Sequence, residues 1–305
     1  MPSLKRVPAG ADDFDAMDSA NVEVAQKVKV VKPQEETTNN NFLPIDNDIL
    51  PTKGRFYNGR RLSGRTLKVI ELKKLSNVTE KDAVKTVNDI MSKVITGVDW
   101  EDIKVADKQA LIFWVRCNTF RDPRFTIAYK CNLEKPSDDM YSDEKEICAT
   151  ENKMSFSIED LEYNYIKEDK LNIDGSVTMI LPFSGDEIIW EYPSNREVEL
   201  IEENFKKLKQ IAKLEKKDEP DYTLVSYACI FKSINGNNNM NVSQKYNYIC
   251  ENLSSADYMY IENTMEDEYS CGVKPSVKAV CKECGGTVEV PVMFSEHFFN
   301  PAFTK

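Results

Sequence analysis

Apolar positions along the chain recur with two different periods, which predict a mixture of helices and strands. Between residues 79 and 97 they recur every three or four positions, as on one face of a helix. Residues 106–115 predict a second helix, with Asp107 placed to cap its first turn. Leu67 and Val69 lie two positions apart, which favours a short strand before these helices.

Alternating apolar residues predict strands around two pairs of cysteines. One strand runs into Cys131, another follows Cys148, and a third follows Cys284 with its apolar residues at the same offsets as the second. The alternating residues are Phe125, Ile127 and Tyr129, then Met154, Phe156 and Ile158, and finally Val290, Val292 and Phe294. We therefore expect each pair of cysteines to lie on a β-hairpin.

The order of these elements occurs twice. The pattern Ile-Leu-Pro-x-x-Gly at residues 49–54 recurs at residues 180–185. In each half an Ala-Asp pair follows, and its aspartate stands 24 positions before a cysteine: Asp107 before Cys131, and Asp257 before Cys281. Repetition of both order and spacing predicts an internal duplication.

The expected fold class is α+β, built from two small, duplicated α/β modules that each carry a hairpin resembling a zinc knuckle. Residues 1–47 are polar and without apolar periodicity, which predicts a disordered arm. The first repeat would span residues 48–170 and the second residues 171–305. In the second, Ser194 and Glu197 form a capping box before a predicted helix.

Composition narrows the class of protein. The 305 residues carry a net charge of −11, so a phosphate backbone would be repelled on average and nucleic-acid binding is not favoured. No apolar run approaches the ~18 residues of a membrane helix, and the first residues lack the apolar core of a secretory signal. We therefore expect a soluble protein whose eight cysteines are reduced in a cytosolic compartment.

The two cysteine pairs are candidate metal ligands. Cys281 and Cys284 form a C-x-x-C knuckle, which is half of a tetrahedral zinc site. If the repeat holds, Cys131 and Cys148 supply the other half, with a polar insertion between them. A local alternative uses Cys271, Cys281, Cys284 and His297. The third possibility is that no metal binds and the thiols pack as small apolar groups.

The remaining candidate residues favour packing over catalysis. Cys117, Cys229 and Cys250 lie in apolar surroundings and are expected in the core. His297 is the single histidine, so any histidine-dependent enzyme mechanism would rest on it, and its phenylalanine neighbours favour a docking segment. Patterns of the GxxxxGK[ST], GxGxxG and HExxH types are absent. We therefore expect a protein that is not an enzyme.

An ordered set of short motifs resembles one protein family. The motif residues are Leu50, Pro51, Gly54, Tyr57, Ala106, Asp107, Cys131, Cys281, Cys284, Gly285, Phe298, Phe299 and Pro301. From about Leu50 to the C-terminus the set resembles the baseplate hub assembly family of T-even-like contractile-tailed bacteriophages. The long insertion between Cys131 and Cys148 departs from that pattern.

The resemblance implies a virion tail baseplate component or an assembly factor for one, present in the host cytoplasm during assembly. Its partners would be other baseplate or tail proteins in a hetero-oligomeric assembly, with no nucleic acid and no membrane, and no catalytic residues are carried over. An acidic chain with a polar arm and a structural zinc suits such a docking role. The alternative is a zinc-ribbon protein that binds nucleic acid or acts in transcription, which predicts salt-dependent binding.

Overall fold

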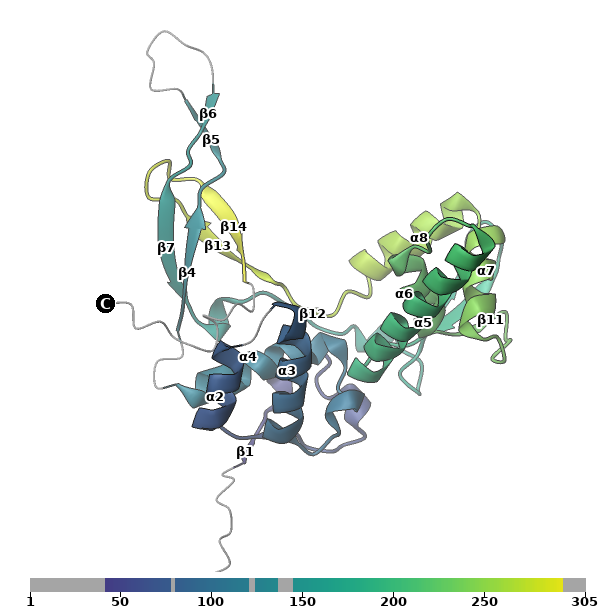
Figure 1. The fold of residues 1–305 in the computed structure, drawn as a ribbon, viewed down its shortest axis with the longest axis horizontal. Helices are drawn as coiled ribbons and strands as arrows, with labels where there is room; N and C mark the ends of the chain where they lie inside the picture. Colours follow the sequence, from purple (N-terminus) through teal and green to yellow (C-terminus); the bar gives the residue numbers. More distant parts are fainter. Residues whose placement is uncertain (1–41, 78–79, 121–123, 137–144, 293–305) are drawn as a thin grey trace, which may run out of the picture. The chain divides into compact units, whose positions relative to one another are not determined.

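The computed structural model describes residues 42–77, 80–120, 124–136 and 145–292 (Figure 1). Most of the predicted arm and the whole Phe-rich end, including His297, lie outside the described residues. The last residues of the predicted arm are described: β1 (Leu43–Pro44) pairs with β2 (Ser63–Gly64), and Ile45 is buried.

The first half begins with a three-stranded sheet and three helices. The strands are β1, β2 and β3 (Ile95–Thr96), and the helices are α2 (Val69–Ser76), α3 (Glu80–Val94) and α4 (Val105–Thr119). The two helices predicted from periodicity are present. The strand predicted at Leu67 and Val69 is wrong, because Lys68 donates its N–H to Glu71 at 2.7 Å and so starts a helix there.

Two long hairpins carry the cysteine pairs (Figure 1). In the first, β4 (Phe125–Lys130) pairs with β7 (Glu151–Phe156), and in the second, β13 (Ser276–Val280) pairs with β14 (Thr287–Pro291). The insertion between Cys131 and Cys148 contains its own pair of strands, β5 (Glu134–Pro136) and β6 (Lys145–Ile147). The strands predicted on either side of the cysteines are therefore present in part. β7 ends at Phe156, and Ile158 begins a short 3-10 helix instead; β14 ends at Pro291, before Val292, and Phe294 lies outside the described residues.

The remaining described elements combine a three-stranded antiparallel sheet with four helices. Its sheet has the order β11-β10-β9, and a short pair, β8 and β12, precedes the second hairpin. The bounds are β8 (Tyr163–Asn164), β9 (Val177–Ile180), β10 (Glu187–Trp190), α5 (Asn195–Glu215), α6 (Tyr222–Ile230), β11 (Phe231–Ile234), α7 (Val242–Glu251), α8 (Ser255–Asp267) and β12 (Gly272–Val273). The capping box predicted at Ser194 is present, with Glu197 accepting the Ser194 N–H at 2.8 Å.

Buried side chains form two hydrophobic clusters. The first contains apolar residues of the first half together with the inward face of the second hairpin, including Val277, Val288 and Val290. The second contains residues of β9, β10, β11 and the helices that follow, among them Trp190 and Ile261. Helices combined with small antiparallel sheets make this an α+β fold. No helix in the described ranges is long and apolar enough to cross a membrane.

The two Leu-Pro-x-x-Gly loops are held by equivalent hydrogen bonds. Asp107 accepts the N–H of Thr52 at 2.8 Å, and Asp257 accepts the N–H of Phe183 at 2.9 Å. Thr52 and Phe183 each follow the proline of the repeated motif. The prediction that Asp107 caps its own helix is wrong: its buried carboxylate also accepts the hydroxyls of Thr52 and Tyr57, and so it binds the loop instead.

Candidate metal centre

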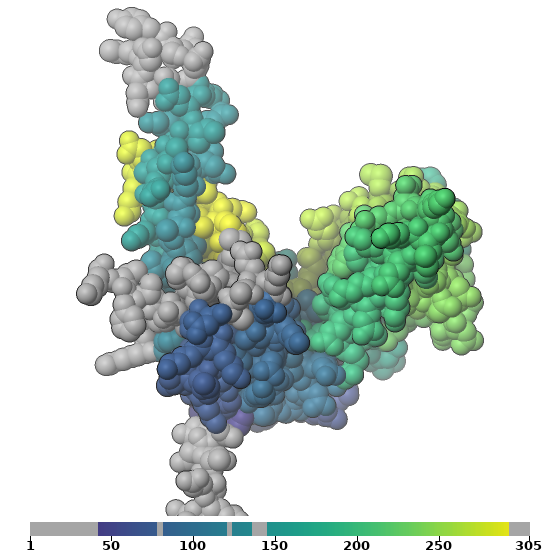
Figure 2. Space-filling view, in the orientation of Figure 1, coloured from purple at the N-terminus to yellow at the C-terminus, as the bar shows by residue number. Residues whose placement is uncertain are grey.

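Four cysteine side chains lie together where the two long hairpins meet. We call Cys131, Cys148, Cys281 and Cys284 the thiol cluster; their sulfur atoms all lie within 4.8 Å of one another. The shortest contacts join different hairpins, with Cys131 Sγ 3.7 Å from Cys284 Sγ and Cys148 Sγ 3.7 Å from Cys281 Sγ. In Figure 2 the second hairpin (yellow) lies against the first (teal).

The second cysteine turn is closed by two backbone hydrogen bonds. Cys281 donates its N–H to the carbonyl of Gly286 at 2.9 Å, and Gly285 donates its N–H back to the carbonyl of Cys281 at 3.0 Å. Gly285 has a φ of +68°, which glycine adopts without steric cost. This geometry explains why a glycine directly follows the C-x-x-C pair.

The first cysteine turn closes in the same way despite its insertion. Cys131 donates its N–H to the carbonyl of Thr150 at 2.9 Å, and Ala149 donates to the carbonyl of Cys131 at 3.1 Å. Cys148 donates to the carbonyl of Leu133 at 2.8 Å, which brings the two ends of the inserted strands together. The insertion therefore extends away from the turn as a separate pair of strands. Cys131 and Cys148 still lie together in the thiol cluster.

The dimensions of the thiol cluster suit a tetrahedral metal ion. Sulfur atoms bound to zinc at about 2.3 Å would lie about 3.8 Å apart, close to the two 3.7 Å contacts. A disulfide would need about 2.05 Å, and all four thiols are free. Cys131 and Cys281 are each 1% exposed. Cys284 is partly buried. The donor set is therefore largely buried and made of soft thiol ligands of the kind that bind zinc.

The sulfur atoms differ in their electrostatic surroundings. The N–H of Cys284 is the main group that lowers the pKa of Cys281, to about 6. At Cys131 the N–H of Leu133 lowers the pKa, but burial and the neighbouring thiols outweigh it and raise the pKa to about 12. The hydroxyl and N–H of Thr150 lower the pKa of Cys148. Neighbouring thiolates repel one another, so all four ionise together only around a cation.

Comparison with known proteins adds no relative to this picture: no protein family, curated protein or solved structure matches the chain.

The other predicted ligands and buried cysteines lie elsewhere. Cys271 packs against the second hydrophobic cluster, whereas Cys281 belongs to the first, and His297 is outside the described residues. Cys117 and Cys229 are partly buried. The prediction that Cys250 is buried is wrong, because it is exposed near the end of α7. It is turned about 100° around the helix axis from the buried Ile249.

Sequence reasoning missed one polar residue at the thiol cluster. Asn152 is 4% exposed, and its side-chain Nδ2 lies 3.4 Å from Cys281 Sγ. It lies on β7 in the same alternation as Met154 and Phe156, on the face of the strand that points inward. Asn152 is a polar residue at a position where the alternation with Met154 and Phe156 predicts an inward-facing side chain, and that mismatch could have identified it from the sequence.

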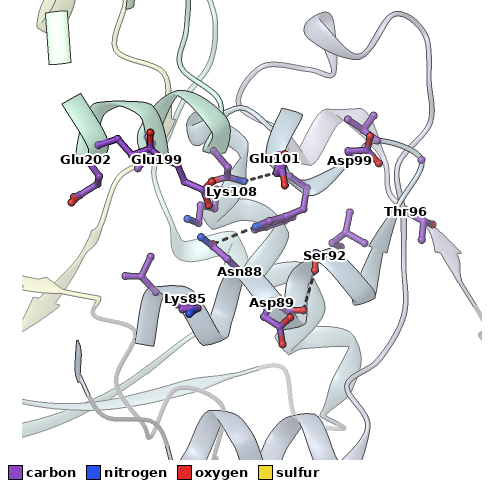
Figure 3. Close-up of a pocket in the computed structure, with 18 of the residues that line it drawn as sticks. Lys85, Asn88, Asp89, Ser92, Thr96, Asp99, Glu101, Lys108, Glu199 and Glu202 are labelled. Atoms are coloured by element: carbon purple, nitrogen blue, oxygen red, sulfur yellow. Dashed lines mark hydrogen bonds between the residues drawn. The ribbon is translucent and has the colours of Figure 1, made fainter. Parts of the chain in front are cut away.

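An open cleft of about 1300 Å³ is the second candidate site (Figure 3). Asn88 accepts the indole N–H of Trp100 at 3.3 Å, and the Ser92 hydroxyl donates to the carbonyl of Asp89. Burial lowers the pKa of Lys108, and Glu199 opposes that effect. The residues that line this cleft in the described part of the chain include neither cysteine nor histidine. The thiol cluster is therefore the stronger candidate.

Proposed function

We propose that this protein is a non-catalytic structural component, in which the thiol cluster binds one zinc ion that joins the two hairpins. The observation that carries the proposal is the four sulfur atoms within 4.8 Å, two from each hairpin. Four protein ligands leave no coordination position for a substrate, so the ion would act structurally.

The zinc would stabilise a contact between segments far apart in sequence. Cys131 and Cys281 are separated by 150 residues (281 − 131), and their hairpins otherwise meet through contacts such as the Tyr129 hydroxyl donating to the carbonyl of Val280 at 3.1 Å. Metal bound only by the folded arrangement adds its binding free energy to folding. The hairpins would therefore act as one rigid unit.

We further infer that the chain arose by internal duplication. Two pairs of features support this: the equivalent loop contacts of Asp107 and Asp257, and the equivalent closure of the two cysteine turns. Unrelated halves would have no reason to share both sequence spacing and hydrogen-bond pattern.

The assembly that best fits is the phage tail baseplate or its hub, with docking to other baseplate or tail proteins as the mode of action. The support is the ordered motif set from Leu50 onward, the acidic charge of −11 and a cluster of four thiols whose proposed metal ion would have no coordination position open to a substrate. Under this proposal the protein acts by presenting rigid surfaces to its neighbours in a hetero-oligomeric assembly.

The zinc site is tested by elemental analysis of the purified chain, measuring zinc and iron together. We expect one zinc per chain in the unmodified protein and in the Cys250→Ser control, whose exposed thiol lies outside the cluster. Cys131→Ser and Cys281→Ser should each lose it. Zinc that survives Cys131→Ser but not Cys271→Ser would favour the local ligand set, and iron or no metal would overturn the proposal.

The assembly role is tested on purified virions of a phage that encodes this chain. Antibody detection of the protein in particles, or in baseplate intermediates from infected cells, is the expected result. Absence from both would contradict the role. Filter binding to DNA and RNA at low salt tests the nucleic-acid alternative, which predicts strong retention that falls as salt rises.

A further inference from the structure

The orientation of the Asn152 side chain is determined by its partners. Its Oδ1 accepts the backbone N–H of Lys282 at 3.2 Å, and only an oxygen can fill that position. Its Nδ2 therefore faces two acceptors, the carbonyl of Thr150 at 3.1 Å and Cys281 Sγ at 3.4 Å. Every hydrogen bond of this buried amide goes to one of the two cysteine turns.

Asn152 belongs to the first hairpin, but the sulfur that it contacts belongs to the second. On β7 it pairs with Tyr129 of β4, and its side chain reaches across to Cys281. The cysteine turns supply their own backbone N–H groups to their own sulfur atoms, as those of Glu283 and Cys284 do for Cys281. The Asn152 amide is a donor from outside the turn, and it connects the two halves of the cluster.

We propose that Asn152 is a positioning residue of the metal centre, which donates an N–H to the metal-bound Cys281 thiolate and fixes that thiolate against the first hairpin. This inference rests on the proposed zinc site. Four thiolates around one divalent ion carry a net charge of −2, and an N–H donor withdraws part of that charge from the sulfur. Removing a residue that hydrogen-bonds to a metal ligand commonly lowers metal affinity by about 10- to 100-fold.

The test compares three variants of the full chain. Asn152→Asp keeps the shape and the acceptor for Lys282 but replaces both N–H donors with a carboxylate. Asn152→Ala removes the whole group. Tyr129→Phe is the matched control, because it deletes a hydrogen bond between the same two hairpins, to the carbonyl of Val280, and leaves the Asn152 bond to Cys281 in place.

Two readouts separate sulfur contact from simple hairpin stapling. Zinc affinity is measured by competition with a chelator of known affinity, and the expected rise in Kd is about 10-fold for Asn152→Ala and towards 100-fold for Asn152→Asp. The Co²⁺-substituted protein reports on the sulfur directly through its sulfur-to-cobalt charge-transfer band. Loss of the N–H raises the energy of the sulfur electrons, so the band should move to longer wavelength in both Asn152 variants and stay in place in Tyr129→Phe.

The outcomes distinguish this inference from the site itself. If the unmodified protein binds neither zinc nor cobalt, both are overturned. If it binds metal and the Asn152 variants keep the wild-type band and affinity, the metal centre stands and the positioning role is wrong. Equal weakening in Asn152→Ala and Tyr129→Phe with no band shift would likewise overturn the positioning role, because it would show only stapling of the hairpins.

Discussion

Ala149 and Gly285 occupy the same position in the two cysteine turns. Each follows the second cysteine of its pair, and each donates its N–H to the carbonyl of the first, at 3.1 Å for Ala149 and 3.0 Å for Gly285. Both have positive φ, +54° for Ala149 and +68° for Gly285. The backbone geometry of the two turns is thus the same, although only Gly285 is a residue type that adopts a positive φ without steric cost.

Two single substitutions, Ala149→Gly and Gly285→Ala, should change the free energy of unfolding in opposite directions. An L-residue in the left-handed region costs about 1–2 kcal/mol. Replacing it with glycine removes this strain, but the greater conformational entropy of glycine in the unfolded chain offsets part of the gain. Ala149→Gly should therefore stabilise the protein by about 0.5–1 kcal/mol and Gly285→Ala should destabilise it by a similar amount. Space is not limiting at Gly285, because nothing lies within 4 Å of an added Cβ.

Denaturant unfolding at a fixed free zinc concentration measures both changes. Ala128→Gly on the neighbouring strand β4 is the control, since Ala128 is exposed and has no positive φ. It should destabilise slightly, as glycine does in strands. Destabilisation by Ala149→Gly as large as that of the control would contradict the equivalence of the two turns.

Asp107 and Asp257 each hold one Leu-Pro-x-x-Gly loop, and we call each set of hydrogen bonds a loop clasp. Removing the Asp107 carboxylate should strongly lower the free energy of unfolding. Asp107→Ala leaves the N–H of Thr52 and the hydroxyls of Thr52 and Tyr57 buried without their acceptor. We expect a loss of about 3 kcal/mol in the free energy of unfolding. Asp89→Ala on α3 is the control, because Asp89 is exposed and pairs with an exposed Lys93; it should change stability little, and an equal loss in both variants would contradict the clasp.

The two clasp aspartates should respond to acid in opposite ways. Burial raises the pKa of Asp107, and the bonds from Thr52 and Tyr57 do not fully offset it. Burial also raises the pKa of Asp257, but the N–H groups of Phe183 and Ser184 and the Ser254 hydroxyl outweigh it, so its pKa is lowered. The stabilisation from Asp257 is then present above the unfolded pKa of about 3.9 and lost as pH falls through its folded value.

Unfolding free energies measured from pH 3 to pH 7 test this contrast. The advantage of the wild type over Asp257→Asn should shrink as the solution is acidified below about pH 4. For Asp107 the folded pKa lies above the unfolded one, so the wild type should gain stability relative to Asp107→Asn as pH falls from that raised pKa towards the unfolded value of about 3.9. Parallel pH profiles for the two variants would show that the clasps share one electrostatic environment, contrary to this prediction.

Breaking the buried ion pair between Arg65 and Glu71 should cost more than breaking an exposed one. Two parallel hydrogen bonds join them, Nη1 to Oε2 at 2.9 Å and Nη2 to Oε1 at 2.7 Å, and both side chains are largely buried. Arg65→Met leaves the carboxylate without its partner, with an expected loss of about 3 kcal/mol. Lys93→Met, which breaks the exposed pair with Asp89, is the matched control and should have little effect. Thermal unfolding of both variants measures the difference, and the midpoint should fall only in Arg65→Met.

The sequence by itself determined the local elements. Alternation predicted β4, β7 and β14, periodicity predicted α3 and α4, and Ser194 with Glu197 predicted the start of α5. These succeed because strand alternation, helix periodicity and capping depend on residues within a few positions of one another. The offsets around the cysteines also favoured the four thiols that lie together, with a local ligand set and a site without metal left as alternatives, since hairpins with equal offsets present their cysteines alike.

Tertiary structure decided what lies far apart along the chain. Asp107 binds a loop 55 residues away, and Asn152 contacts a sulfur atom 129 residues away. A pattern of polar and apolar residues says which side chains are buried, but it does not say which distant group will meet them there. That choice depends on how the hairpins and helices pack, because a buried polar group is stable only beside the partner that the fold supplies.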